Sequence, residues 1–309
     1  MPKKIKMKRR KFIRMTGLGT ASTMLFASGI TQCNMNNTTA EDLNAYLRSI
    51  IDVDEPSVDR IVIGDPNTKI RKIGTAWMPY WKTLKKAVEE GVNTMVVHEP
   101  TFYTHWDLDA ENTDYLRAPI PAKDNYSQVV SEKKKWIEDN GLVIIRCHDV
   151  LDKVPDWGIP YALGKGLGLS NDTIIRSKKF YNVYEIEPTP AGKVAQQIAA
   201  SLKVVDQPGV EFYGDENYSV KTIGLGTGCI CDPLDYSELQ PDLFIGIDDT
   251  IRTWIQTTYA EDTGQPLVVI NHGTSEEFGV QSLNEHLAAT FRDYEVIHLK
   301  QGCGYRWIT

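Results

Sequence analysis

Three apolar segments of the chain each end in a histidine that is followed by a carboxylate. The histidines and the acids after them are His98 with Glu99, His148 with Asp149 and Asp152, and His272 with Glu276. Continuous apolar runs are typical of strands buried on both faces, and open α/β sheets place their sites at the C-terminal ends of such strands. Imidazole and carboxylate together suit Zn, Fe or Mn, and two such ions can act as a pair. The sequence therefore predicts a metal centre.

The His272–Glu276 pair is a weak motif by itself. A spacing of four residues places both side chains on one side of a helical turn. Thr274 and Glu277 have the spacing of a capping box, which would engage Glu277 and leave Glu276 available. In the alternative interpretation, Glu276 only favours the helix dipole and His272 is a hydrogen-bonded turn residue. The two other strand ends favour the metal interpretation.

The other two strand ends offer further donors. His98 and Glu99 are adjacent, so their side chains diverge in an ideal strand. At a bend they could ligate two ions separately, and Pro100 favours an extended exit from the strand. His148 has two open interpretations, direct ligation or a hydrogen-bonded histidine that orients a ligand. We assign it as the catalytic candidate, which would orient a ligand or transfer protons.

Strands and helices alternate around these residues, which predicts layered α/β architecture with substantial parallel pairing. Expected strands cover residues 60–63, 72–76, 94–97, 142–147, 180–186, 220–225, 243–246, 266–270 and 295–299. Expected helices run from Thr39 to about 51 and over 81–90, 127–139, 158–167, 191–202, 250–259 and 276–290. We also expect a long loop near the site at 103–125 and a second lobe at about 175–215.

The glycine-rich segment 224–228 is expected to form a tight strand-exit loop beside the site. It is a poor dinucleotide fingerprint, because its third glycine comes too early and Pro233 interrupts the helix that would bind phosphate. The sequence holds no Walker motif, no Gly-x-Ser-x-Gly elbow and no His-Glu-x-x-His helix.

Several other cysteines, histidines and tryptophans are expected to have structural roles and no part in the chemistry. The cysteines after residue 33 are interpreted as small buried residues; a strained disulfide or a soft-metal site at Cys-x-Cys is the alternative. Three histidines lack ligand-like context, and two tryptophans are expected in the core or an interface. These residues are Cys147, Cys229, Cys231, Cys303, His105, His286, His298, Trp77 and Trp81.

The charge distribution separates a basic N-terminus from an acidic body. The 309 residues carry a net charge of −7, with 41% hydrophobic and 24% charged residues. Residues 1–32 hold eight Lys or Arg and no acid, so the remainder has 26 basic against 41 acidic residues. An acidic body argues against nucleic-acid binding, which needs basic surfaces.

Residues 1–33 are expected to be an export signal. Lys8–Arg–Arg–Lys–Phe–Ile–Arg14 has the paired arginines and the aromatic of a twin-arginine signal, and a weakly apolar stretch follows over 15–30. Cys33 would either carry a lipid or be lost or left free by cleavage nearby, and residues 34–40 form a linker. The protein would then be periplasmic, or a lipoprotein anchored to the membrane by that lipid alone. A basic tail without a signal function is the alternative.

The order of these motifs resembles the NIF-three-like family of dinuclear metal-centre proteins, which carries the historical label type 2 GTP cyclohydrolase I. The resemblance covers roughly residues 41–309 and rests on five segments. His98–Pro100 resembles the family's His-His-Pro motif, and His148–Asp152 resembles its His-Thr-x-x-Asp motif. Gly226–Gly228 is similar to the family's glycine-rich strand exit, and Pro241–Asp248 is similar to its Ala-Asp-x-x-x-Thr-Gly-Glu segment. Asn271–Glu276 resembles the late Gly-His-x-x-Ser-Glu motif.

The resemblance implies a two-lobed α/β subunit with layered mixed sheets and flanking helices, often assembled as a ring-shaped hexamer. It implies metal ligation by His98, Asp152, His272 and Glu276. Of these, Glu276 would bridge the two ions. Glu99 stands in place of the family's second tandem histidine, a change that keeps a ligand but favours Fe, Mn or Mg over Zn. Arg252 falls near another family histidine, so an acid or base of the family is missing.

The resulting hypothesis is an exported hydrolase that binds two divalent ions (Fe, Mn or Zn) and acts on an unidentified small molecule. A non-catalytic metal-binding or scaffold protein of the cell envelope is the alternative, and GTP cyclohydrolase activity is third. A homo-oligomer is expected. The predicted ligands are His98, Glu99, Asp152, His272 and Glu276.

Overall fold

The computed structural model describes residues 37–107, 123–306 and 308. The predicted export signal at 1–33, with Cys33, lies outside the described residues, as does most of the loop expected at 103–125. The linker expected at 34–40 is described only from residue 37, and helix α1 (Ala40–Arg48) begins at its last position. Among the helices of the described part, none combines the length with the apolar character needed to cross a bilayer.

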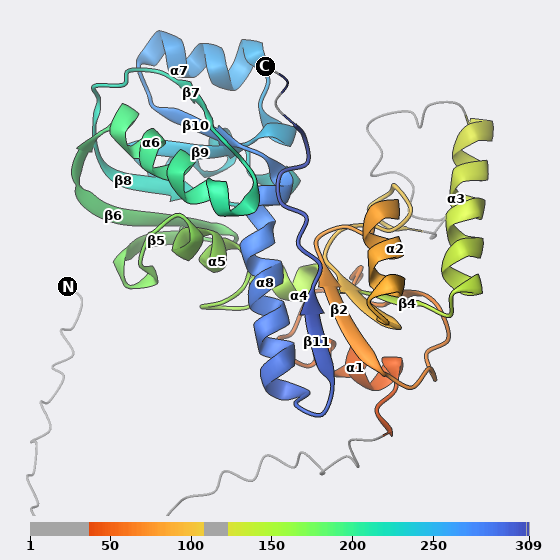
Figure 1. The fold of residues 1–309 in the computed structure, drawn as a ribbon. Coiled ribbons are helices and arrows are strands. Elements are labelled where there is room, and N and C mark those ends of the chain that lie inside the picture. Colours follow the sequence, from red (N-terminus) through yellow and green to blue (C-terminus); the bar gives the residue numbers. More distant parts are fainter. Residues whose placement is uncertain (1–36, 108–122, 307, 309) are drawn as a thin grey trace, which may run out of the picture. The chain divides into compact units, whose positions relative to one another are not determined.

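The first sheet has the strand order β1-β4-β3-β2-β11 (Figure 1). These strands are β1 (Ile61–Ile63), β2 (Lys72–Ala76), β3 (Thr94–Val97), β4 (Val143–Arg146) and β11 (Glu295–His298). Four of them, β4, β3, β2 and β11, pair in parallel, and β1 is antiparallel to β4. Every residue of β3 and β4 is buried, as predicted for apolar runs hidden on both faces.

Helices cover both faces of the first sheet, because alternate strand residues point to opposite sides. Val96 of β3 packs in a core with α1 and α8 (His272–Thr290). Met95 and Val97 pack in a second core with α2 (Trp81–Glu89) and α3 (Lys123–Asp139). The short helix α4 (Asp149–Lys153) follows β4 directly. The result is a three-layer α/β/α arrangement.

The second sheet has the strand order β5-β6-β8-β9-β10-β7. Its strands are β5 (Ile174–Lys178), β6 (Tyr181–Pro190), β7 (Glu211–Tyr213), β8 (Ser219–Leu225), β9 (Leu243–Ile247) and β10 (Leu267–Ile270). The pairs β8–β9 and β9–β10 are parallel, and the others are antiparallel. These strands come from residues 174–270, a wider range than the 175–215 expected for a second lobe. The two mixed sheets with flanking helices confirm the predicted fold class.

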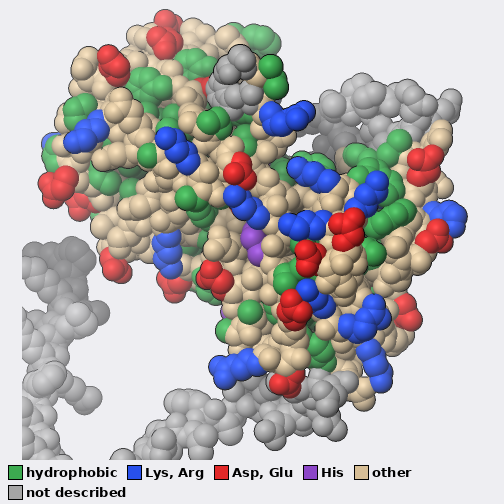
Figure 2. All heavy atoms as spheres, in the orientation of Figure 1, with side chains coloured by type: hydrophobic (Ala, Val, Ile, Leu, Met, Phe, Trp, Pro, Cys, Tyr) green, Lys and Arg blue, Asp and Glu red, His purple; other side chains and the backbone are tan. Residues whose placement is uncertain are grey.

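Helices α5 (Ile159–Gly166), α6 (Ala191–Leu202) and α7 (Thr258–Thr263) belong to the second sheet's half of the chain (Figure 1). Residues predicted as a helix at 250–259 instead form a short 3-10 turn, a π-helical turn at Thr253–Thr257 and then α7. On the face drawn in Figure 2, basic and acidic side chains are interspersed over the described residues.

Helix α8 connects the two halves. It starts where β10 of the second sheet ends, and it packs against β2 and β11 of the first sheet and against α5 (Figure 1). Val280, Leu283 and Leu287 lie in the core between α1 and the first sheet, whereas Phe278 packs on the core of the second sheet. The first turn of α8 therefore lies where strand ends of both sheets meet.

Candidate metal centre

The predicted ligands all follow the C-terminal ends of parallel strands. His98 and Glu99 come directly after β3, and His148 follows β4 with only Cys147 between them. Asp152 lies on α4, one turn after His148. His272 and Glu276 occupy the first turn and a half of α8, after β10. Two strands of the first sheet and one of the second therefore deliver the donors to one place.

Glu276 lies between two histidine rings. Its Oε1 atom is 3.1 Å from Nε2 of His272, and its Oε2 atom is 3.4 Å from Nε2 of His98. Glu99 faces the same Nε2 atom of His272, with its Oε1 atom 3.2 Å away. The spacing of four residues between His272 and Glu276 thus brings both onto one side of α8, as the sequence predicted.

Asp152 faces the same Nε2 atom of His98 that Glu276 faces. Its Oδ1 atom is 3.7 Å from Nε2 of His98, and its Oδ2 atom is 3.5 Å from Nδ1 of His148. The two imidazole rings stack with centroids 4.5 Å apart and an angle of 9° between their planes. The structure therefore brings together all six residues that the sequence nominated.

Each of the three histidines uses Nδ1 for a hydrogen bond to an oxygen that can only accept. The acceptors are the carbonyl of Cys147 for His98, the carboxylate of Asp149 for His148 and that of Asp249 for His272, at 3.2, 2.9 and 2.7 Å. Nδ1 must therefore carry a proton and donate it, which leaves the lone pair of Nε2 available in the neutral ring. Histidines that ligate metals through Nε2 are oriented in this way.

The Nε2 atoms of His98 and His272 are buried and have no hydrogen-bond partner. Leaving a buried polar atom without a partner costs about 1–3 kcal/mol, so each such atom needs an explanation, and a bound ion is one. Two sets of side chains could each hold an ion, with donor atoms within 4.8 Å of one another. One set is His98, His148 and Asp152, and the other is His98, Glu99 and Glu276. The donor set fits divalent ions of the Fe, Mn or Zn kind.

The buried carboxylates create a strongly negative field. Burial alone would lower the pKa of His98, but Glu276, Asp152 and Glu99 outweigh it and raise that pKa to about 9. Burial would also lower the pKa of His272, but Glu276, Asp249 and Glu99 together outweigh it and raise that pKa well above its ordinary value. A field that holds protons on histidine this firmly also attracts a cation.

Asp152 and Glu99 respond in opposite directions. Burial raises the pKa of Asp152 to about 6, although His148 and His98 oppose the change. Burial also disfavours the charge on Glu99, yet its contact with His272 lowers the pKa to about 2. Both carboxylates therefore favour a positively charged partner. Asp152 is costly to ionise without one, and Glu99 is ionised because His272 lies beside it.

Arg146, the last residue of β4, is a buried cation that sequence reasoning missed. Its Nε donates to the carbonyl of His98 at 3.0 Å, and its other nitrogens face Glu99 at 3.7 Å and Asp107 at 3.5 Å. It also donates to the carbonyl of His105. A charged residue inside a buried strand was the available signal, because such a residue needs a partner.

His105 also borders the site, contrary to the expectation that it lacks a ligand-like context. Its ring lies edge-on to His148, with centroids 5.4 Å apart and planes at 83°. Burial, together with the positive charges of Arg146 and His148, lowers the pKa of His105 to about 4. The polar loop that holds it gave no periodic pattern from which this position could be inferred.

Trp77, expected to be a packing residue, contacts the site directly. Its indole Nε1 donates to Oε2 of Glu276 at 2.7 Å, and its ring lies edge-on to His272. Trp77 directly follows β2, which is parallel to β3, so a third strand of the first sheet also delivers a residue to the site. Trp81 instead packs against Trp136, in keeping with the structural interpretation.

The glycine-rich segment lies beside the site, as predicted. Gly228 has a φ of +66°, and a Cβ atom there would lie 2.6 Å from Oε1 of Glu276 and 3.5 Å from Nε2 of His272. Only glycine allows the backbone to approach the carboxylate this closely without strain. The segment therefore forms a wall of the centre.

The predicted capping box at Thr274 and Glu277 is wrong. Helix α8 begins at His272, so Thr274 lies within its first turn and donates to the carbonyl of Asn271. Glu277 accepts from the backbone N–H groups of Gln301 and Gly302 and contacts His298 at 2.8 Å. A tertiary contact with the C-terminal strand thus replaces the local cap, and Glu276 is still free to face the site.

His286, Arg252 and the cysteines lie in different environments, and only some of them match their structural interpretation. His286 contacts Tyr46 and stacks on Trp157, away from the candidate ligands. Arg252 is exposed before the π-helical turn. Among the cysteines of the described part, Cys147 and Cys231 are buried, Cys303 is half-buried and Cys229 is exposed. The two exceptions therefore depart from the expected burial.

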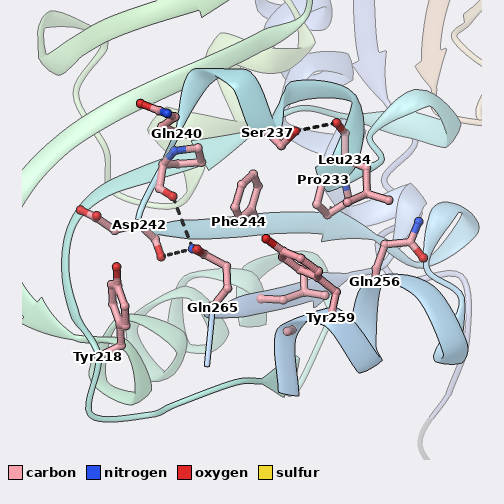
Figure 3. A pocket seen from close by; sticks show the side chains of 13 residues that line it. Tyr218, Pro233, Leu234, Ser237, Gln240, Asp242, Phe244, Gln256, Tyr259 and Gln265 are labelled. Atoms are coloured by element: carbon pink, nitrogen blue, oxygen red, sulfur yellow. Dashed lines mark hydrogen bonds between the residues drawn. The ribbon is translucent and has the colours of Figure 1, made fainter. Parts of the chain in front are cut away.

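A separate cavity of about 420 Å³ lies at the other ends of the second-sheet strands (Figure 3). Phe244 and Leu267, at the beginnings of β9 and β10, form part of its wall, together with Tyr218, Tyr259 and Gln265. Gln265 donates to the carbonyl of Asp242, as Figure 3 shows. None of the predicted ligands lines this cavity, because they follow the opposite strand ends.

Comparison with known proteins places this fold and site in a family. Residues 58–302 match the Duf34/NIF3 (NGG1p interacting factor 3) family. A curated relative, the GTP cyclohydrolase 1 type 2 homolog of Methanocaldococcus jannaschii, is 24% identical over 241 residues, or 77% of this chain and 88% of the relative.

Solved structures agree in fold. A hypothetical protein from Staphylococcus aureus has a TM-score of 0.68 at 19% identity, covering 87% of this chain and 99% of that one. Reduced HcgD from Methanocaldococcus jannaschii has a TM-score of 0.62 at 20% identity, covering 85% and 98%. A Bacillus cereus protein related to NIF3 has a TM-score of 0.67 at 12% identity, covering 88% and 100%. The family match spans most of the sequence and confirms the resemblance drawn from the motifs, and the chain therefore belongs to the Duf34/NIF3 family.

Proposed function

We propose that this protein is a dinuclear metal-dependent hydrolase that acts on a small molecule. The observation that carries the proposal is the pair of buried, unpartnered Nε2 atoms on His98 and His272, which face buried carboxylates. In the neutral ring each Nε2 atom offers only a lone pair, and the carboxylate oxygens that face it also only accept, so no hydrogen bond joins them. A cation between the nitrogen and oxygen donors satisfies both.

Glu276 would serve both ions, since one of its oxygens faces His98 and the other faces His272. His98 and Asp152 would then hold one ion, and His272 and Glu99 the other. Two divalent ions would also balance the negative charge of the buried carboxylates. When bound, such ions lower the pKa of a coordinated water to about 7 and polarise the bond to be broken.

His148 is the residue that we assign to proton transfer. Asp149 and Asp152 both lie within 3.5 Å of its Nδ1, and His105 lies edge-on to its ring. Burial and the charge of His98 lower the pKa of His148, but Asp152, Asp149 and Glu99 together outweigh them, so the net shift is upward. A protonated His148 could donate to a leaving group, while Asp149 keeps the ring oriented. If His148 instead ligates an ion directly, another residue must act as the general acid.

A non-catalytic metal-binding role is the second candidate, and the enclosure of the site favours it. The side chains of His98, Glu99 and Glu276 are 0%, 9% and 3% exposed. The side chain of His272 is 12% exposed, which leaves a narrow approach for a substrate. Arg252, which is exposed, stands where the family has a histidine, and this difference also favours a non-catalytic role. GTP cyclohydrolase activity, the name carried by the Methanocaldococcus relative, is the third candidate.

The decisive experiment combines metal analysis with a hydrolase screen. Elemental analysis of the purified full chain should give two ions per subunit, and Glu276→Ala should lose metal. Phosphoester, amide and ring C–N substrates are then screened with Mn²⁺, Fe²⁺ and Zn²⁺, with His272→Ala as the control. Activity that His272→Ala abolishes supports the enzyme. Bound metal without any turnover favours the second candidate, and substoichiometric metal that is unchanged in Glu276→Ala rejects both.

We also propose export by the twin-arginine route, with either a lipid on Cys33 or simple cleavage, and assembly as a homo-oligomer. The basis is the Arg9–Arg10 pair, the apolar stretch after it and the family resemblance. Cell fractionation of the full chain and an Arg9→Lys/Arg10→Lys variant tests export, with retention of the variant in the cytoplasm as the expected result. Palmitate labelling with a Cys33→Ala control tests lipidation, and light scattering tests assembly.

A further inference from the structure

Trp77 is bound to the metal centre through both its side chain and its backbone. The indole Nε1 donates to Oε2 of Glu276 at 2.7 Å. The carbonyl of Trp77 accepts from the backbone N–H groups of His98 and Glu99 at 3.1 and 2.8 Å. Trp77 therefore forms hydrogen bonds with three of the five predicted ligands and a ring contact with a fourth, His272.

The indole ring has little freedom to move. Trp77 is 5% exposed, and its ring lies edge-on to His272 and to Tyr80, with centroids 5.4 and 6.1 Å away. At Gly273 a Cβ atom would lie 3.0 Å from the ring, so the helix backbone passes close to the indole. Packing thus fixes where the N–H group points.

A fixed donor restricts the carboxylate that accepts from it. The indole can only donate, and it takes one of the lone pairs of Oε2. Rotation of the Glu276 carboxylate would break this bond, and the buried N–H group would then lack a partner. The hydrogen bond therefore keeps Oε2 on the side of His98 and Oε1 on the side of His272.

We propose that Trp77 is a positioning residue that holds one oxygen of Glu276 toward each of two ion positions. This inference rests on the proposed function, because it assigns Trp77 a role toward the ions held there. It also means that the indole lies next to the centre, so its fluorescence reports on whether the centre is filled. A tryptophan that packs in the core away from the centre would have neither property.

The test compares Trp77→Phe with Trp81→Phe in the metal-stripped full chain. Phenylalanine keeps an aromatic ring but removes the N–H donor. Trp81 is a matched control because it also stands near β2 but packs against Trp136, with centroids 5.7 Å apart. Outer partners of metal ligands typically contribute 10–100-fold to affinity. We expect calorimetric titration with Zn²⁺ to show a loss in this range for Trp77→Phe and no change for Trp81→Phe.

Fluorescence provides a second readout, which tests whether the indole of Trp77 lies next to the filled centre. Co²⁺ should quench the emission of the wild-type chain, and most of that quenching should be absent in Trp77→Phe and present in Trp81→Phe. Equal affinity and equal quenching in Trp77→Phe and wild type would overturn the proposal. If the wild-type chain itself binds no metal, the proposed function fails first and the inference falls with it.

A measurement on the unmodified chain covers the case in which Trp77→Phe does not fold. The chain has seven tryptophans, so its nitrogen-15 spectrum should contain seven indole N–H resonances. Zn²⁺ should shift one of them strongly, because the acceptor of that N–H gains a cation. Binding of Zn²⁺ without a shifted indole resonance would contradict the proposal.

Discussion

The carboxylate of Asp249 lies 2.7 Å from Nδ1 of His272, on the far side of the ring from Glu276 and Glu99. Asp249 follows β9, so a neighbouring strand of the second sheet supplies the residue that orients His272, a predicted ligand on α8. The backbone N–H of His272 also donates to Asp248 at 2.9 Å. Ring and backbone of His272 are thereby both fixed from the same turn.

Replacing Asp249 by alanine should weaken metal binding without unfolding the protein. The ring of His272 would lose its orienting acceptor, and we expect Zn²⁺ affinity to fall by about 10–100-fold. Competition with a chromophoric chelator measures the affinity. Asp262→Ala, an exposed carboxylate on α7, is the matched control. Equal losses in both variants would show that surface charge, and not ring orientation, sets the affinity.

A methyl group at Gly228 should disrupt the centre itself. The Cβ atom of Gly228→Ala would lie 2.6 Å from Oε1 of Glu276, so the carboxylate or the loop must move. Gly141→Ala is the control, since Gly141 has a similar φ of +60° but nothing within 4 Å of the added atom. Both variants should lose about 1–2 kcal/mol of stability from backbone strain. Only Gly228→Ala should also lose metal, as measured by elemental analysis.

Glu99→His should move the metal preference toward zinc. Imidazole suits Zn²⁺ better than carboxylate does, whereas carboxylate suits Mn²⁺. We expect the ratio of Zn²⁺ to Mn²⁺ affinity to rise, and stability to fall by less than the roughly 3–5 kcal/mol typical of a broken buried pair. The smaller loss follows because Arg146 keeps Asp107 and two main-chain acceptors. An unchanged affinity ratio would place Glu99 outside the set of ligands.

Lys133 should make stability rise with pH in the alkaline range. Its Nζ donates to the carbonyl of Thr101 at 2.6 Å, and burial lowers its pKa from 10.5 to about 8, against the opposing charge of Asp107. Between these pH values the unfolded chain binds the proton and the folded chain does not, so the free energy of unfolding increases with pH. The gain is a few kcal/mol at most, at about 1.4 kcal/mol per pKa unit.

Urea unfolding of wild type and Lys133→Met between pH 8 and pH 10.5 tests this dependence. The variant should lack the increase that wild type shows. Lys135→Met is the control because the side chain of Lys135 is 75% exposed. A wild-type slope that survives in Lys133→Met would assign the effect to another group.

The predicted ligands could be found from sequence because they follow the most regular segments of the chain. Residues 94–97, 142–147 and 266–270 are apolar runs, and strands buried on both faces require such runs. The polar and aromatic residues that support the ligands were missed for a related reason. Trp77 follows the predicted strand 72–76, which is not a continuous apolar run and therefore was not read as a strand that ends at the site.

Contacts between distant segments account for the rest. The partner of Glu277 is a strand more than twenty residues later, and a local spacing rule assigned it to a helix cap instead. Asp249 reaches His272 only because β9 and β10 are neighbours in the second sheet. Strand order depends on which surfaces pack together, and no periodicity within one segment encodes it.

Helix α8 carries two predicted ligands in its first turns and core residues of the first sheet further along. An ion that binds only the folded chain lowers the free energy of that state, so metal concentration and melting temperature are thermodynamically linked. Since the same helix packs on both sheets, neither sheet can unfold alone without releasing the ion. The chain should accordingly melt in one cooperative transition when loaded, and the midpoint of that transition should measure how much metal it holds.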